Sequence, residues 1–307
     1  MNWGNLLWRA SVALVTLFIA SLIVFFSLNL IPGDPALSLL GVGATPDAVA
    51  ALREQLGLNL PPISRYLTWL GHALRGDLGE SIRYSQPVGQ LLTARLPFTL
   101  LLTLFSLLLS GAAALTLGVL AARRAGRPLD FALRLVLTLL SAVPAFWLGL
   151  LLILLFAVRL HLLTSTGFSR PADLILPILT LVLVRVSLPT RMVRSALLGA
   201  LRSDYVRTAR AKGLSERRVL LGHGLRGALV PLLTVLGLEF AELLTGTVIV
   251  ENVFALPGLG TLALQAIAAR DFPLVQGVVL LLAAFVVLVN LLVDVAYGLA
   301  DPRVRYG

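Results

Sequence analysis

The chain of 307 residues contains no cysteine, a single lysine at position 212 and few charged residues. The absence of cysteine excludes disulfide bonds, thiolate nucleophiles, iron–sulfur clusters and zinc sites built on cysteine. Charged residues make up 13% of the chain, whereas soluble domains carry about a quarter. A disulfide-rich secreted scaffold, a disordered chain and an ordinary cytosolic enzyme are therefore excluded.

Several catalytic and cofactor motifs are also absent. Lys212 is followed by Gly213 and Leu214, so the phosphate-binding pattern GxxxxGK[ST] does not occur. The three histidines, His72, His161 and His223, are far apart in the sequence, and no HExxH pattern is present. We therefore expect no cofactor, no metal site and no nucleotide hydrolysis by this chain.

Apolar residues dominate what is present. They make up 58% of the chain, and the mean hydropathy is +0.94. Crossing about 30 Å of hydrocarbon takes roughly 20 mostly apolar residues in a helix. Six runs meet this requirement: Ala10–Ile31, Phe98–Ala122, Phe131–Val158, Leu174–Met192, Ala228–Val250 and Leu274–Tyr297. The sequence predicts an all-α polytopic membrane protein with six transmembrane helices, the first of them retained rather than cleaved as a signal peptide.

The net charge of +10 is better explained by membrane topology than by nucleic-acid binding. With the N-terminus inside, the cytosolic segments hold most of the basic residues, which are Arg9, the group at 123–134, the run from Arg191 to Arg226, Arg303 and Arg305. The long outer segment balances its arginines with aspartate and glutamate. This asymmetry follows the positive-inside rule and predicts that both termini are cytosolic.

The predicted spans divide the chain into three parts. Residues 1–31 form the N-terminus and first helix, residues 32–95 form an extracytoplasmic helical segment, and residues 96–307 form the remaining five spans. Within the outer segment, helical patterns run over Pro46–Leu56 and Leu58–Leu78. This segment is interpreted either as a subdomain that packs on the outer mouth or as a docking surface for an external partner.

The most informative segment is the cytosolic loop 193–227 between the fourth and fifth spans. It is densely basic, yet it keeps apolar residues at helical spacing up to Tyr205 and Ala209. After Gly213 a second amphipathic stretch begins, and Ser215 is placed to cap it. The pattern predicts a helix, a glycine turn and a second helix. Such a loop could lie on anionic lipid or could fit a groove in a partner and move the attached spans.

Two spans carry charged residues that need a partner. Glu239 and Glu242 are three residues apart on one face of the fifth span, and Arg185 lies in the fourth. A charge at the membrane centre costs at least about 2.5 kcal/mol on insertion scales and usually faces a bundle interior or a cavity. Arg185 is the expected partner, either in an inter-helix ion pair or in the lining of a pathway.

Pro144 is expected to kink the third span, and Pro177 and Pro189 the fourth.

The loop around residues 204–214, Asp-Tyr-Val-Arg-Thr-Ala-Arg-Ala-Lys-Gly-Leu, resembles the conserved permease loop of ABC importers of the dipeptide/oligopeptide/nickel branch. Arg207-Thr208-Ala209 stands where other importers have Glu-Ala-Ala, and Gly213 holds the expected glycine. Gly227 departs from the asparagine that is common in this branch. The resemblance extends over nearly the whole chain through motifs at 30–35, 76–81, 95–97, 143–149, 251–260, 270–273 and 301–303.

This resemblance implies a transport subunit rather than an enzyme. The implied partners are a second homologous permease, two cytosolic ATP-binding subunits, an extracytoplasmic solute-binding protein and the lipid bilayer, with no nucleic acid. The implied location is the bacterial inner membrane, which the chain crosses several times. A short coupling helix at about Leu198–Ala209, within the 198–214 loop, is expected to enter a groove of one ATPase. The expected contact residues are Asp204, Tyr205, Arg207, Ala209, Lys212 and Gly213.

The cargo and one alternative mechanism stay open. Members of this branch carry peptides, nickel or metal–chelator complexes, and the segment 251–255 is slightly closer to the nickel and metallophore members. The alternative is an ion-coupled secondary transporter that uses Glu239, Glu242, Arg185 and Asp294. A non-transporting membrane scaffold is a third possibility. Co-purification with a nucleotide-binding subunit would separate the first hypothesis from the other two.

Overall fold

A computed structural model describes residues 3–29, 43–55 and 59–300. The motifs at 30–35 and 301–303 lie outside these residues, and so does the side chain of Asp294. The described part is almost entirely helical, as predicted, with one antiparallel hairpin of β1 (Glu80–Ser81) and β2 (Gln86–Pro87) that the sequence analysis missed. The long helices are α1 (Trp3–Asn29), α5 (Val88–Arg123), α12 (Leu225–Val253) and α14 (Phe272–Ala300).

The remaining helices are shorter. Between α1 and the hairpin they are α3 (Pro46–Gln55) and α4 (Pro62–Ala73). The next group comprises α6 (Pro128–Ala142), α7 (Ala145–Leu152), the π-helix η1 (Ile153–Arg159), the 3-10 turn η2 (Pro171–Leu174), α8 (Ile175–Arg185) and α9 (Ser187–Leu201). The last group comprises α10 (Asp204–Ala211), α11 (Glu216–Arg218), the π-helix η3 (Val219–Gly224) and α13 (Leu259–Ala268).

Four helical segments among the described residues are long and apolar enough to cross a membrane. They are Leu7–Ser27, Val88–Arg123, Gly227–Val253 and Phe272–Val293. Two bent pairs raise the number to six if each pair is one span: Pro128–Ala142 with Ala145–Arg159, bent by 104°, and Pro171–Arg185 with Ser187–Leu201, bent by 49°. The structure therefore agrees with four to six spans. The predicted boundary at residue 95 falls inside α5, which begins at Val88.

Both bends coincide with the prolines singled out in the sequence. Val143 is extended, as expected for the residue before a proline, and Pro144 then begins a new helical direction in α7. In the fourth predicted span the bend lies at Val186. Pro189 lacks the N–H that would bond to the carbonyl of Arg185 four residues earlier. Pro177 lies in the first turn of α8, where a proline does not interrupt the helix.

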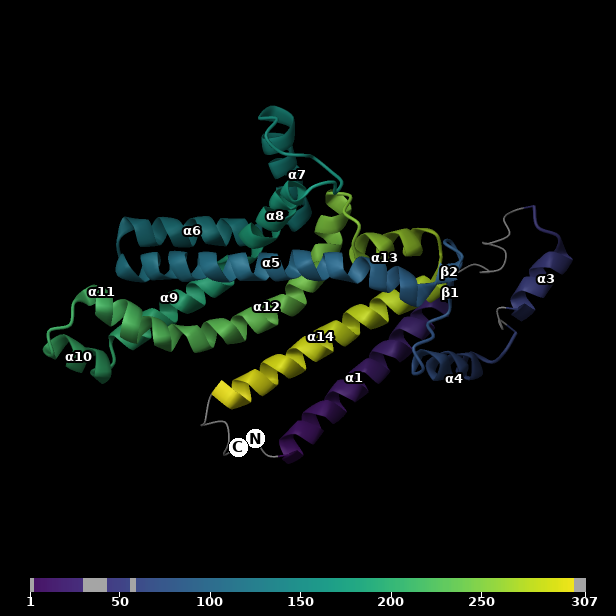
Figure 1. Ribbon diagram of the computed structural model, residues 1–307, viewed down its shortest axis with the longest axis horizontal. Coiled ribbons are helices and arrows are strands. Elements are labelled where there is room, and N and C mark those ends of the chain that lie inside the picture. The colour runs from purple at the N-terminus through teal and green to yellow at the C-terminus, as the bar shows by residue number, and fades with distance from the viewer. Residues whose placement is uncertain (1–2, 30–42, 56–58, 301–307) are drawn as a thin grey trace.

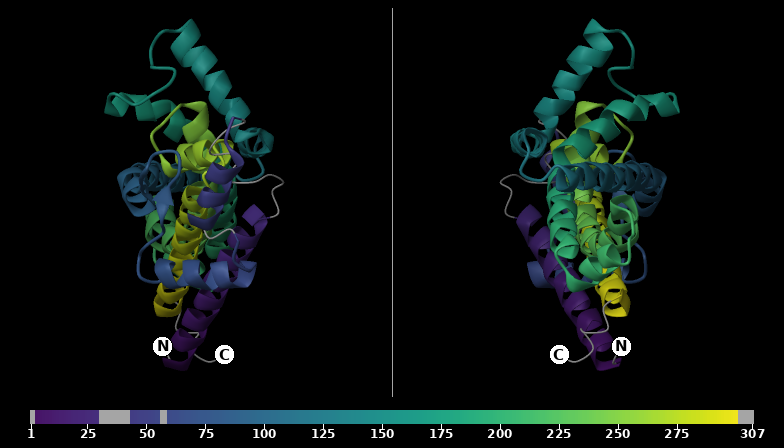
Figure 2. Two further views of the ribbon diagram at one scale, coloured as in Figure 1. Left: turned by 90° about the vertical axis from the view of Figure 1, so that its right-hand side faces the viewer. Right: turned by 90° about the vertical axis from the view of Figure 1, so that its left-hand side faces the viewer.

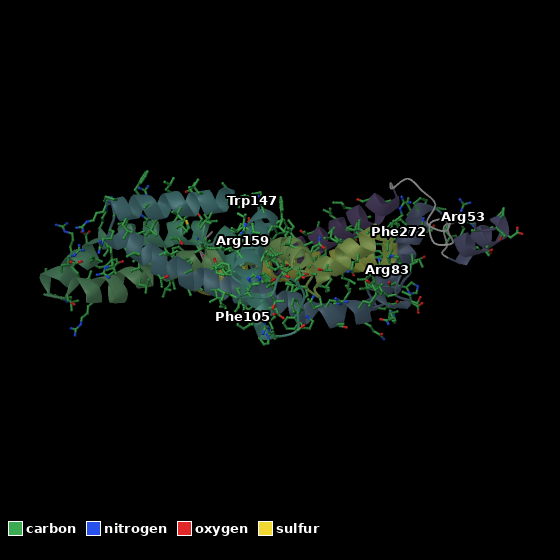
Figure 3. All side chains as sticks on the ribbon, turned by 90° about the horizontal axis from the view of Figure 1, so that it is seen from above. Arg53, Arg83, Phe105, Trp147, Arg159 and Phe272 are labelled. Atoms are coloured by element: carbon green, nitrogen blue, oxygen red, sulfur yellow. The ribbon has the colours of Figure 1, made fainter. Side chains whose placement is uncertain are left out.

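The elements are arranged along one long axis (Figure 1). The loop with α10 and α11 lies at one end, and α3, α4 and the hairpin lie at the other. The turned views show the α7 segment standing away from the other helices (Figure 2). Apolar side chains such as Phe105 and Trp147 are exposed around the spans (Figure 3), as expected for helices that face lipid or another membrane subunit.

Small residues bring the long helices close together. A side chain at Gly118 of α5 would meet Val193 of α9, and one at Gly111 would meet Leu236 of α12. Glycine at helix contacts allows the backbones to approach, which is the usual basis of association in membranes. Helices α5, α9 and α12 therefore form a packed unit that connects the loop end to the middle of the molecule.

Candidate functional site

The loop that the sequence singles out is built from α10 and the turn that follows it. The predicted single helix Leu198–Ala209 is wrong, because α9 ends at Leu201 and α10 starts at Asp204. Ser203 between them is extended, and its hydroxyl donates to the carbonyl of Ala200 at 2.5 Å. A side chain bonded to the preceding turn in this way competes with continuation of the helix.

The inner face of α10 packs on a small apolar cluster. Val206, Ala209 and Val219 are buried there, and Leu201 and Leu214 cover them. Ala209 therefore lies inside the chain rather than on the surface where the sequence analysis placed it. Asp204, Tyr205, Arg207, Lys212 and Gly213, the other five predicted contact residues, are all exposed. The structure thus presents a mainly charged outer surface on a short helix with a buried apolar base.

The predicted glycine turn is present. Gly213 has φ +76°, a conformation that L side chains rarely adopt. Its N–H donates to the carbonyl of Arg210 at 2.9 Å. Ser215 occupies the predicted cap position of α11, but its side chain makes no capping hydrogen bond.

An ion pair crosses this turn. The Arg210 guanidinium donates to both carboxylate oxygens of Glu216, from Nε at 2.7 Å and from Nη2 at 3.2 Å, and Nη1 also donates to the carbonyl of Leu201 at 3.3 Å. The hydrogen bond from Arg210 lowers the pKa of Glu216 and stabilises its charged form. Because both side chains are exposed, the pair orders the turn but contributes little to overall stability.

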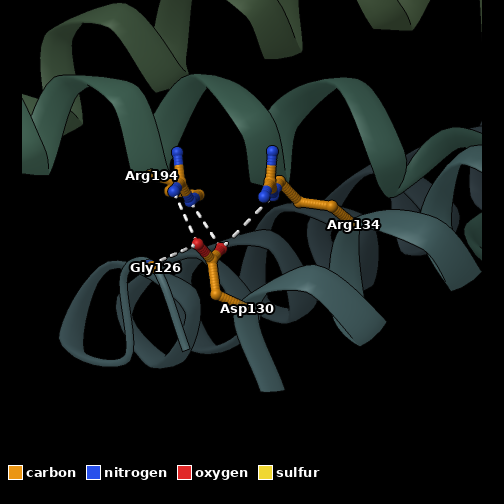
Figure 4. A network of polar contacts seen from close by, with 4 residues as sticks. All are labelled: Gly126, Asp130, Arg134 and Arg194. Carbon is orange, nitrogen blue, oxygen red and sulfur yellow. Dashed lines mark hydrogen bonds and ion pairs between the residues drawn. The ribbon is translucent and has the colours of Figure 1, made fainter. Parts of the chain in front are cut away.

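The loop is connected to the rest of the chain by a buried aspartate that the sequence analysis did not identify. Asp130 of α6 accepts hydrogen bonds from Nε and Nη2 of Arg194 in α9, both at 2.7 Å (Figure 4). The N–H of Gly126 also donates to it at 3.0 Å, and Arg134 lies 3.5 Å away. The sequence analysis used Arg134 and Arg194 only as positive charges of the cytosolic segments. The ion pair could have been suspected because Asp130 is a single acidic residue among arginines near the end of a predicted span.

The charged residues of the predicted fourth and fifth spans lie together. Arg185 forms an ion pair with Glu242, and its Nη1 lies 3.9 Å from Oε2 of Glu239. The two carboxylates differ in their surroundings, since the Glu239 side chain is 5% exposed and that of Glu242 is 63% exposed. Glu239 therefore faces the interior of the helix bundle, and Glu242 faces outward from this chain.

Further polar groups lie on the helices that surround this cluster. The hydroxyls of Ser106 and Ser110 in α5 and Ser187 in α9 are buried and have no hydrogen-bond partner within the described residues. The contact of Gly111 with Leu236 places Ser110 near the level of Glu239, one turn further along α12. A seam of unsatisfied polar groups thus follows the contact of α5, α9 and α12.

At the opposite end, Glu251 is fully buried and accepts several hydrogen bonds. The donors are Thr99 Oγ1 at 2.7 Å and the N–H of Gly260 at 2.7 Å, with the N–H of Thr261 at 3.4 Å. The hydroxyl of Thr99 accepts in turn from the N–H of Leu259 at 2.8 Å. This network joins α5, the end of α12 and the start of α13. The sequence analysis used Glu251 only within a family motif and missed this role.

Asp271 connects the hairpin of β1 and β2 to the turn between α13 and α14. It accepts from Ser81 Oγ at 2.5 Å and from the N–H of Arg83 at 3.1 Å, while the N–H of Leu274 lies at 3.3 Å from its second oxygen. Tyr84 adds a hydrogen bond to Gln265 at 2.9 Å.

Within the described residues, no group of three or more histidine, aspartate or glutamate side chains could hold a metal ion.

Comparison with known proteins accounts for nearly all of the chain. Residues 114–306 match the family model described as binding-protein-dependent transport system inner membrane component, and residues 4–103 match the corresponding N-terminal model. A putative peptide transport system permease of Brucella melitensis is 41% identical and covers all of both chains. The di/tripeptide transport permease DppB of Pseudomonas aeruginosa is 39% identical over 97% of both chains. The glutathione transport permease GsiC of Salmonella paratyphi A is 40% identical over 95% of both.

Solved structures show the same fold in more distant proteins. A chain of the inward-facing MetNI methionine ABC transporter matches 69% of this chain and 97% of its own length, with a TM-score of 0.59 and 22% identity. A chain of an amino acid ABC transporter solved with histidines matches 70% of this chain and 94% of its own, with a TM-score of 0.52 and 19% identity.

Proposed function

Because this chain belongs to the family of binding-protein-dependent transport system inner membrane components, we propose that it is one half of the translocation pathway of an ATP-driven peptide importer. Permease subunits of this kind are transport components and not enzymes, and the ATPase is a separate subunit. The proposed setting is the inner membrane of a bacterium, with six spans and both termini in the cytosol. Each bent helix pair then counts as one span.

The observation that carries the proposal is the construction of α10. It is a short helix with an exposed charged face and a buried apolar base, and it lies between α9 and the short segments that lead into α12. A groove in an ATPase could hold such a helix through its outer surface while the base keeps it fixed to this chain. Asp204, Tyr205, Arg207, Lys212 and Gly213 are the proposed contact residues, and Ala209 supports them from inside.

Movement of α10 would be transmitted through packed contacts. Helix α9 is fixed to α6 by Arg194 and Asp130 and to α5 at Gly118. Helix α12 is fixed to α5 at Gly111. When two ATP-binding subunits close, they favour the state in which the attached loops are also close together, and hydrolysis removes that preference. This chain thus contributes different contacts in the two states rather than any chemistry.

The proposed pathway runs beside the polar seam of α5, α9 and α12, with Arg185, Glu239 and Glu242 at its side. A peptide carries both an ammonium and a carboxylate, and this cluster offers both signs of charge. Peptides are the proposed cargo because relatives of about 40% identity are named for peptides, di/tripeptides and glutathione. The leaning of the sequence analysis towards nickel and metallophores has no support in those names.

The proposed assembly contains a second related permease, two ATP-binding subunits and an external solute-binding protein that delivers the peptide. The alternative of an ion-coupled secondary transporter is not favoured, because the full-length relatives are binding-protein-dependent permeases. In the proposed assembly the face of Glu242 that is exposed in this chain would meet the second permease or the pathway.

A proline in α10 tests the coupling. Val206, in the first turn of α10, is unsuitable because it is buried, so a proline there would also remove a packed side chain. Thr208 lies in the middle of α10 on its exposed side, and Thr208→Ala keeps the helix. With partner subunits in proteoliposomes, we expect Thr208→Pro to lower ATP-driven peptide uptake at least about tenfold, because an interior proline costs about 3 kcal/mol.

Thr208→Ala is the matched control and should retain uptake close to that of the parent. Both variants should still co-purify with the second permease, which separates uncoupling from failure to insert. Parental uptake by Thr208→Pro would refute the role of α10, and absence of any ATP-binding subunit from the purified complex would refute the importer assignment.

A further inference from the structure

The outer helix α4 has an apolar face that no part of the described chain covers. Ile63 and Leu67 are one turn apart on this face, and Leu74 follows just beyond the helix end. Their exposed fractions are 68%, 60% and 81%, respectively. The opposite face carries Ser64, Arg65, Thr68 and His72. Helix α4 is therefore amphipathic. Its apolar face is wider than the part that packs on the rest of the protein, and the remainder of that face is exposed.

The packed side of α4 rests on α1 through aromatic side chains. Tyr66 lies with ring centroids 5.4 Å from Phe25 and 6.4 Å from Phe18, and its hydroxyl is 2.8 Å from Ser21 Oγ. Trp69 lies 5.7 Å from Phe25. These contacts fix the position of α4 along α1, and the turned views show α4 lying across α1 rather than along it (Figure 2).

The partner residues on α1 belong to a candidate membrane span. The span runs over Leu7–Ser27, and a helix rises about 1.5 Å per residue, so Ser21 lies about 9 Å inside its outer end. One leaflet contributes about 15 Å of hydrocarbon. With the proposed cytosolic N-terminus, α4 is thus attached to α1 within the outer leaflet, at about the 5–10 Å depth to which interfacial helices bury their apolar face.

From this geometry we propose that α4 lies in the outer leaflet as an interfacial helix, with Ile63, Leu67 and Leu74 among the lipid acyl chains. Phe18 of α1 is 49% exposed and also meets Tyr66, so the exposed surface of α1 reaches the edge of α4. Arg65 extends its guanidinium over the ring of Phe25, 5.9 Å from the centroid, so its apolar stem stays on the protein. The outer segment is then anchored to the bilayer at a second point beside α1.

The absence of cysteine from the chain permits a direct test. Leu67→Cys and Thr68→Cys place one thiol on the apolar and the polar face of the same helix turn. The full-length chain, purified with partner subunits whose cysteines have been replaced, is labelled with bimane and reconstituted into phosphatidylethanolamine–phosphatidylglycerol vesicles with or without brominated acyl chains. We expect brominated lipid to reduce emission at position 67 at least about twofold and to change position 68 little, because only the apolar face enters the acyl region.

Two results would overturn the proposal. One is equal quenching at positions 67 and 68. The other is rapid labelling of Leu67→Cys by a membrane-impermeant maleimide that stops when the solute-binding protein is added, since this would make α4 a protein-docking face. Ile63→Cys is a second probe of the same face if Leu67→Cys does not assemble. Neither result bears on uptake or on α10, so the anchor can fail while the importer assignment stands.

Discussion

The two ends of the molecule are stabilised in different ways. At the outer end, Glu251 and Asp271 are fully buried, and each accepts hydrogen bonds from groups distant in the sequence. At the inner end, α10 is held by a small apolar cluster of three buried residues, two of them its own, and it carries exposed ion pairs such as Arg210 with Glu216. The carboxylates of Glu251 and Asp271 find their hydrogen-bond donors within this chain, whereas the outer surface of α10 has no covering element among the described residues.

This difference indicates where the chain depends on other subunits. Buried, hydrogen-bonded carboxylates hold the surrounding helices in one arrangement because separating them leaves polar groups unsatisfied. Exposed ion pairs contribute about 0–1 kcal/mol and impose little order. The inner loop is thus the part whose position an external groove could set, as the coupling proposal requires.

The largest expected effect is at Glu251. Glu251→Ala leaves the hydroxyl of Thr99 and the N–H of Gly260 buried without their acceptor, and each such group costs about 1–3 kcal/mol. We expect unfolding of the purified chain in detergent to become easier by about 4 kcal/mol. Asn252→Ala, at the exposed neighbouring position, should change stability little. Equal stability of the two variants would show that the outer network is not a main source of stability.

Asp130 is expected to give an intermediate effect at the base of the inner loop. Asp130→Asn removes one charge-assisted hydrogen bond from Arg194, which amounts to about 2 kcal/mol. Arg134→Gln is the matched control, because Arg134 is half exposed and 3.5 Å from Asp130, so its loss should cost under about 0.5 kcal/mol. The same detergent unfolding measurement applies. A larger effect of Arg134→Gln would reverse the assignment of partners.

Local patterns in the sequence were sufficient for the long helices, but not for α13, which was not predicted. Apolar runs predicted the long helices, proline predicted the breaks near Val143 and Val186, and glycine predicted the turn at Gly213. These features depend on residues a few positions apart, so a single sequence contains them. The break at Ser203 was missed because the hydroxyl of Ser203 bonds to the backbone of the preceding turn, which apolar spacing does not reveal.

Contacts between distant segments could not be predicted in the same way. Glu251 with Thr99 and Asp271 with Ser81 join residues more than 150 positions apart. In the sequence these carboxylates belong to short motifs and give no sign of burial. Arg185 with Glu242 is the exception, because a charge inside an apolar run requires a partner and few candidates exist. A charged residue inside an apolar run therefore predicts a contact with a distant residue of opposite charge. A carboxylate in a polar segment between the spans predicts no such contact.

The turn at Gly213 should show a smaller effect. Gly213→Ala forces a side chain into φ +76° and should destabilise the loop by about 1 kcal/mol. Gly199→Ala is the control: a Cβ at either glycine meets no atom within 4 Å, but Gly199 is helical. Alanine there should stabilise α9 by about 0.5–1 kcal/mol. Lower hydrogen-exchange protection of the 202–218 amides in Gly213→Ala, with higher protection of the α9 amides in Gly199→Ala, would confirm that backbone conformation is the cause.

The smallest expected effect is the pH response of the Arg210–Glu216 pair. Arg210 lowers the pKa of Glu216 below the ordinary value of 4.5. A carboxyl whose pKa is lower in the folded state stabilises that state above the unfolded pKa and loses this contribution as the pH falls through the folded pKa. Hydrogen-exchange protection of the α10–α11 turn, corrected for intrinsic rates, should therefore decline as the pH drops below 4.5. Glu216→Gln should abolish most of this decline while leaving the amides around Glu251 unchanged. An unaltered decline in Glu216→Gln would mean that a group other than Glu216 orders the inner loop.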